Sequence, residues 1–105
     1  MATCRDLNEA PELCGLQEQY SDVLEVVEID LLENKFSDKI NDFLSDRPID
    51  IFINNAGVMG PPNQDFQSIS VEPWIDVMKV NLIAPLIITQ SIVNNMLLGK
   101  EKKMF

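Results

Sequence analysis

Residues 49 to 60 read Ile-Asp-Ile-Phe-Ile-Asn-Asn-Ala-Gly-Val-Met-Gly, an apolar strand that runs directly into Asn54-Asn55-Ala56-Gly57. Open α/β sheets bind ligands at the carboxyl ends of their strands, and this strand presents two amides and two small residues there. The pattern is typical of the floor of a nucleotide site. It also fits simple turn chemistry at the end of a core strand, because Asn and Gly tolerate positive φ.

The segments around this strand alternate between short β-type runs and longer helical ones. Caps are expected at Asn8, which puts Pro11 in the first turn of a helix, and at Ser70, ahead of Pro73. The expected elements after the short start are helix 9–20, strand 23–29, helix 34–45, strand 49–53 and helix 74–98. This order predicts a single doubly wound α/β domain with parallel strands.

Composition excludes several classes of function. The 105 residues carry a formal charge of −9, which disfavours nucleic-acid binding. The chain has no histidine, so His-containing zinc sites and Ser-His or Cys-His nucleophiles are excluded, and no metal site is expected. No secretory signal begins the sequence, and five polar residues in 82–98 make that stretch fall short of a membrane span. A cytoplasmic location without membrane contact is expected.

The helix expected over 74–98 carries apolar residues on several faces, which predicts burial on several sides. It can be a core helix or can also form a subunit interface, and a homo-oligomer through this helix is one expectation. Pro85 predicts a kink near Asn81 and Leu82, because its ring clashes with the preceding turn.

Four motifs together resemble the short-chain dehydrogenase/reductase family, whose members are Rossmann-fold, nicotinamide-dependent oxidoreductases. The four motifs are in register with that family and cover nearly the whole chain. They are Ala2-Thr3-Cys4-Arg5-Asp6 at the end of the family's second strand, Asp30-Leu31 after its third strand, Asn54-Asn55-Ala56-Gly57 after its fourth strand, and Val80-Asn81-Leu82 in the next long helix. The resemblance implies a partial dinucleotide-binding domain over residues 1–105, with an incomplete Rossmann-type sheet in the order β-α-β-α-β-α.

The resemblance also implies how the cofactor would be held. Arg5 takes the basic position that pairs with the adenosine 2′-phosphate, which favours NADP(H) over NAD(H). The alternative is that Arg5 only solvates the start of a helix. Asp30 and the backbone of Leu31 would meet the adenine edge.

Under the same resemblance, Asn55, Ala56 and Gly57 would pass below the adenosine ribose, while Asn54 ties the sheet together. Asn81 matches the family's catalytic asparagine, which shapes the helix so that a backbone carbonyl holds a water of the proton relay. An Asn inside a helix can also simply cap a break.

Two parts of the family's machinery are missing from these residues. There is no Gly-rich turn for the pyrophosphate, and the only tyrosine, Tyr20, is followed four residues later by Leu24 rather than by the lysine of a Tyr-x-x-x-Lys pair. In the family's strand order, 3-2-1-4-5-6-7, strand 49–53 would lose both neighbours. A fragment is therefore expected, arising from a truncated gene model, a splice product or a decayed copy, in which the first and third strands could pair directly.

The resulting hypothesis is the middle section of an NADP(H)-dependent oxidoreductase. Its parent protein would transfer hydride to or from a small-molecule carbonyl or alcohol, and the chain alone would be inactive. The first alternative is a non-catalytic short product that pairs with a full-length relative through helix 74–98. The second is an unrelated doubly wound binding domain.

Overall fold

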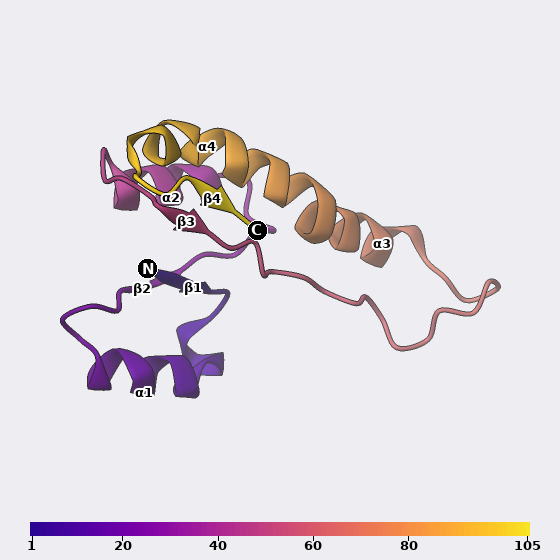
Figure 1. Ribbon diagram of the computed structural model, residues 1–105. Coiled ribbons are helices and arrows are strands. Elements are labelled where there is room, and N and C mark those ends of the chain that lie inside the picture. The colour runs from indigo at the N-terminus through magenta and orange to yellow at the C-terminus, as the bar shows by residue number, and fades with distance from the viewer. The chain divides into compact units, whose positions relative to one another are not determined.

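A computed structural model describes residues 1–105, in which short parallel strands alternate with helices (Figure 1). The strands are β1 (Ala2–Cys4), β2 (Val26–Glu28), β3 (Ile51–Phe52) and β4 (Lys103–Met104). The helices are α1 (Pro11–Gln19), α2 (Phe36–Leu44), α3 (Val71–Met78) and α4 (Ala84–Leu98), with a 3₁₀ turn at Leu7–Glu9 and a π-helical segment at Lys79–Ile83. The predicted α/β class is confirmed. The chain divides into two compact units, Met1–Phe36 and Ser37–Phe105, each described by itself.

The first unit is a β-α-β crossover. Strand β1 pairs in parallel with β2, with Ala2 opposite Val26 and Cys4 opposite Glu28. The N–H of Ile29 donates to the carbonyl of Cys4 at 2.8 Å and extends this ladder by one bond. Helix α1 connects the two strands, as parallel pairing requires.

Helix α1 begins at Pro11 and not at Glu9, because Asp6 and not Asn8 acts as the first cap. The Asp6 carboxylate accepts a hydrogen bond from the N–H of Asn8 at 2.8 Å and closes the 3₁₀ turn that precedes α1. Pro11 then starts the helix, where a missing N–H costs nothing. The choice of Asn8 as the cap was therefore wrong.

Strand β2 is shorter than the predicted 23–29. The N–H groups of Val23 and Leu24 both donate to the carbonyl of Tyr20, at 3.0 and 2.8 Å. These two residues therefore belong to the turn that ends α1 and are not available to the strand ladder.

The second unit contains a strand pair that the sequence did not predict. Strand β3 pairs in parallel with β4, with Ile51 opposite Lys103 and Phe52 opposite Met104. The N–H of Asn54 donates to the carbonyl of Phe105 at 2.7 Å, so the backbone of Asn54 does tie this sheet together. The expectation that strand 49–53 loses both neighbours was wrong on one side. Direct pairing of the first and third strands is not seen, because β1 pairs only with β2.

One face of the long helix forms most of the core of this unit. Its buried residues recur every four positions and are Val80, Ala84, Ile88, Ile92 and Met96. Helix α2 adds buried Ile40 and Leu44. Asn95 joins α4 to the turn that follows α2 by donating to the carbonyls of Ser45 and Arg47 at 3.0 and 2.8 Å. The other faces are exposed in these 105 residues, so the predicted burial on several sides is not seen.

The α3, π-helical and α4 segments form one continuous helix, Val71–Leu98, of 28 residues. By length and composition it could cross a membrane, since an 18-residue window has a mean hydropathy of 1.4. It is longer than the stretch 82–98 considered from the sequence. The core helix of a water-soluble protein meets the same two criteria, so this observation by itself is a weak indication.

Candidate functional site

The corner that follows β3 is held by the side chain of Asn81. Its Oδ1 accepts a hydrogen bond from the N–H of Val58 at 2.8 Å, and its Nδ2 donates to the carbonyl of Val58 at 2.7 Å. The backbone N–H and carbonyl of Val58, the residue that follows the Asn-Asn-Ala-Gly motif, are thus both paired with the side-chain amide of Asn81. Asn81 therefore orders the end of this exposed corner.

The corner itself presents backbone and small side chains to solvent. Asn55, Ala56 and Gly57 are all exposed. A Cβ added to Gly57 would meet only Oδ1 of Asn81, at an ordinary van der Waals distance of 3.6 Å, and Gly57 does not have a positive φ. Nothing in the described chain itself therefore requires glycine at this position.

The backbone around Asn81 is π-helical rather than α-helical. The N–H of Ala84 donates to the carbonyl of Lys79, five residues earlier. Pro85 has no N–H with which to bond the carbonyl of Asn81, so the regular α-helical ladder is interrupted at this residue. The predicted irregularity thus lies at Lys79–Ile83, and it takes the form of a π-helical segment, a feature that often marks functional positions.

In the first unit, Arg5 follows β1 directly and is paired with Glu9. The Arg5 Nη2 and Glu9 Oε2 atoms lie 2.9 Å apart, and the two side chains are 63% and 66% exposed. Hydrogen bonding to Glu9 raises the pKa of the Arg5 guanidinium, with smaller contributions from Asp30 and Asp6. The predicted basic group is therefore accessible, and a carboxylate accompanies it.

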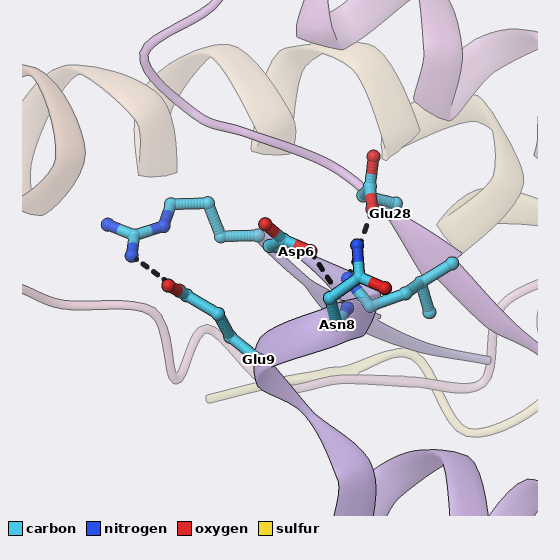
Figure 2. A network of polar contacts seen from close by, with 6 residues as sticks. Asp6, Asn8, Glu9 and Glu28 are labelled. Atoms are coloured by element: carbon cyan, nitrogen blue, oxygen red, sulfur yellow. Dashed lines mark hydrogen bonds and ion pairs between the residues drawn. The ribbon is translucent and has the colours of Figure 1, made fainter.

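The acids around Arg5 have backbone partners of their own. Figure 2 shows Asp6 and Glu28 turned toward the 3₁₀ turn, where Glu28 accepts the N–H of Leu7 at 3.0 Å. The carboxylate of Asp30 accepts the N–H of Leu32 at 2.9 Å in a turn that leaves Leu31 half-buried. The Asp30 carboxylate, which the resemblance assigned to the adenine edge, thus shapes the corner after β2.

The structure brings the candidate residues together in two groups. In the second unit, Asn81 lies with the corner of Asn55, Ala56 and Gly57. In the first unit, Arg5 and Asp30 lie within electrostatic range of each other. Sequence reasoning missed Glu9, although its i, i+4 spacing from Arg5 was a readable signal. It also missed Val58, for which no local signal exists because Asn81 is 23 residues away.

Two other features lie apart from these groups. A shallow pocket lies between the loop and α3 of the second unit and is lined by Met59, Gly60, Pro61, Gln64, Trp74 and Val77. The amide of Gln64 donates to the carbonyls of Met59 and Pro61, so it braces the loop. No group of three or more His, Cys, Asp or Glu side chains is arranged to hold a metal ion.

Comparison with known families and structures gives a consistent result. The short chain dehydrogenase family matches residues 4–103. A search of curated proteins found no match. A carbonyl reductase from Pseudomonas aeruginosa in complex with NADP is 31% identical, with a TM-score of 0.80, over 89% of this chain and 40% of its own.

Two further solved structures are similar. A protein from Burkholderia multivorans described as a short-chain dehydrogenase/reductase, with bound NADP, is 26% identical to this chain with a TM-score of 0.77. The match covers 93% of this chain and 42% of the Burkholderia chain. An NADPH-bound carbonyl reductase from chicken fatty liver is 24% identical with a TM-score of 0.71, over 90% and 38%, and shares the fold. This chain thus spans about two fifths of the length of these proteins.

The family match covers nearly every residue, and the structure holds the asparagine corner and the asparagine of the long helix together by two hydrogen bonds. The chain belongs to the short-chain dehydrogenase family.

Proposed function

We propose that residues 1–105 are the adenosine-binding middle section of an NADP(H)-dependent oxidoreductase. The parent protein would interconvert a small-molecule carbonyl and an alcohol, in the cytoplasm and without nucleic acid or membrane as a partner. The observation that carries the proposal is the Asn81 amide bound to Val58, which orders the exposed Asn55-Ala56-Gly57 corner in a chain of this family.

The residues present fit the adenosine half of the cofactor. Gly57 leaves space at the corner where backbone would approach the ribose, with Asn55 and Ala56 beside it. Arg5 offers an accessible guanidinium for a 2′-phosphate, and Asp30 and Leu31 form the corner assigned to the adenine edge. The NADP-bound relatives support this cofactor over NAD.

The nicotinamide cofactor would donate the hydride in carbonyl reduction and accept it in alcohol oxidation, and the described residues would contribute position rather than proton transfer. Asn81 holds the corner and belongs to the π-helical segment that precedes Pro85. Among these 105 residues no Tyr-x-x-x-Lys pair exists to exchange a proton with the substrate oxygen. We therefore propose that this chain alone binds the cofactor weakly and catalyses no turnover.

Titration with NADPH tests the proposal. We expect quenching of Trp74 fluorescence only well above micromolar NADPH, and no oxidation of NADPH when carbonyl compounds are added. Binding at micromolar NADPH, or turnover, would contradict the proposed division between this section and the rest of the parent protein.

Gly57→Ala supplies a matched variant for the site. Its Cβ meets only an ordinary contact within the chain, so thermal stability should stay unchanged. The added methyl group would occupy the space of the ribose, so the variant should need several-fold more NADPH for the same shift of the residue-57 amide in NMR spectra. Equal binding by the variant and the natural chain would remove the corner from the site.

A second function is favoured by the exposed face of the long helix. Leu82, Leu86, Leu97 and Leu98 are all exposed on α4 and the adjoining π-helical segment. In this proposal the chain is a non-catalytic product that pairs with a full-length relative, or with itself as a homo-oligomer, through residues 74–98. A monomer at every concentration in light scattering would contradict self-association.

A further inference from the structure

Arg5 is a single cationic side chain among many acidic residues. It is the only Lys or Arg among residues 1–34, a stretch that holds nine Asp and Glu residues. Three of these acids, Glu9, Asp30 and Asp6, attract the guanidinium. An anion that approaches Arg5 therefore also meets a carboxylate environment.

Among these acids, Glu9 makes the closest interaction with Arg5. Its Oε2 lies 2.9 Å from Nη2 of Arg5, whereas the carboxylates of Asp6 and Asp30 accept backbone N–H groups of Asn8 and Leu32. Figure 2 shows Glu9 at the outer end of the turn, reaching the guanidinium, while Asp6 turns inward toward Asn8. Glu9 thus occupies Nη2, one of the two terminal nitrogens with which a guanidinium can bind an anion.

We propose that Glu9 is a specificity-determining residue that competes with the 2′-phosphate of the cofactor for Arg5. This inference rests on the proposed role of Arg5 in NADP(H) binding. A phosphate that pairs with the guanidinium displaces the Glu9 carboxylate, and the displaced carboxylate then repels the phosphate from nearby. An adenine nucleotide that lacks the 2′-phosphate neither displaces Glu9 nor meets this repulsion.

The exposure of the pair sets the size of the effect. Solvent screens an ion pair in which both side chains are about two-thirds exposed, so Glu9 should weaken phosphate binding by a modest factor, about two- to five-fold. Because added salt screens exposed charges further, the factor should shrink as ionic strength rises. Glu9 would then adjust the preference between the two nicotinamide cofactors without abolishing it.

Titrations of three single variants test the inference with two simple probes, adenosine 2′,5′-bisphosphate and adenosine 5′-monophosphate. The variants are Glu9→Gln, the charge-matched control Glu12→Gln at the start of α1, and Arg5→Gln. Backbone amide shifts of residues 4–10 in NMR spectra report binding even when the affinity is weak. We expect Glu9→Gln to bind the bisphosphate about two- to five-fold more tightly than the natural chain, with the monophosphate unchanged and with Glu12→Gln indistinguishable from the natural chain.

Different failures overturn different statements. If Glu9→Gln leaves bisphosphate affinity unchanged, or if Glu12→Gln raises it equally, the role of Glu9 is wrong. If Arg5→Gln binds the bisphosphate as well as the natural chain does, the proposed role of Arg5 is wrong as well. Absence of any shift with either nucleotide would overturn the proposed adenosine site itself.

Discussion

At the residue scale, Asn81 is the side chain on which the candidate site depends most. It uses its acceptor and its donor on the same peptide unit, that of Val58, so its amide satisfies the backbone as a neighbouring strand would. This replaces the sheet contacts that the corner no longer makes after Asn54. A role that the resemblance assigned to catalysis is thus accompanied by a structural one.

Asn81→Ala should loosen the corner, because it removes both hydrogen bonds to Val58. We expect a loss of about 1–2 kcal/mol in the free energy of unfolding, measured by urea denaturation. The amide of Val58 should also exchange with solvent faster. Asn94→Ala, at an exposed position of α4, makes the same side-chain change as a control. Equal stability of the two variants would show that the Asn81 bonds contribute nothing.

The thiol of Cys4, next to Arg5, gives a prediction on pH. Burial raises its pKa above the ordinary value, with smaller contributions from Cys14, Glu28 and Asp6. Because the folded state disfavours the thiolate, alkylation by iodoacetamide should follow a curve displaced to higher pH than in the urea-unfolded chain. For the same reason, the stability associated with this group is present below its ordinary pKa and declines as pH rises above it.

Cys14→Ser isolates this effect, since Cys4 is then the only thiol. The displacement should become smaller but persist, because the largest cause is burial and not Cys14. Coincident curves for the folded and unfolded variant would contradict it.

At the element scale, the reversal from α4 into β4 determines how β3 gains a partner. Gly99 is buried at the end of α4, and Asp50 accepts the N–H of Lys100 at 2.5 Å through its carboxylate. The N–H of Lys103 then donates to the carbonyl of Asp50 at 2.9 Å, where the β3–β4 pairing begins. The strand pair therefore depends on close approach of the helix end to Ile49 and Asp50.

Gly99→Ala should disrupt this reversal. A Cβ at Gly99 would lie 2.6 Å from the carbonyl carbon of Ile49, and backbone has to move to admit it. We expect a loss of about 1–3 kcal/mol in the free energy of unfolding. Gly15→Ala serves as the control, because its Cβ meets nothing within 4 Å and alanine favours the helix. Unfolding that is unchanged in Gly99→Ala would show that the reversal tolerates a side chain.

At the scale of the whole molecule, the unpaired surfaces matter more than the core. Each sheet has only two strands, and the long helix buries one face while leucines on its other faces stay exposed. Such surfaces are typical of association or of a larger body. The relatives are longer, and this chain spans about two fifths of their length.

Charge on the exposed helix face should reduce association. Leu82 and Leu86 are each 59% exposed and lie one helical turn apart. The double variant Leu82→Lys and Leu86→Lys should shift the chain toward the monomer in light scattering, because lysine is costly to bury at an interface. Leu16→Lys, on exposed α1, should leave the distribution unchanged. Equal distributions for all three chains would place any association elsewhere.

The sequence by itself determined the family and the order of the elements from β1 to the long helix, but not β4. Period and turn chemistry act over a few residues, which is why α2 and the long helix were predicted to within about three residues, and why the four motifs could be recognised in register. The Arg5–Glu9 pair, four residues apart, was equally local and could have been read in the same way.

Only the tertiary structure decided the contacts between distant residues. The pairing of β3 with β4 joins residues about 50 positions apart, and the Asn81 amide reaches Val58 across 23 positions. No local pattern specifies such partners, because they depend on where the intervening helix returns the chain. The corner of Asn54 to Gly57 could thus be recognised as a motif in the sequence, whereas only the fold shows that the Asn81 side chain orders it.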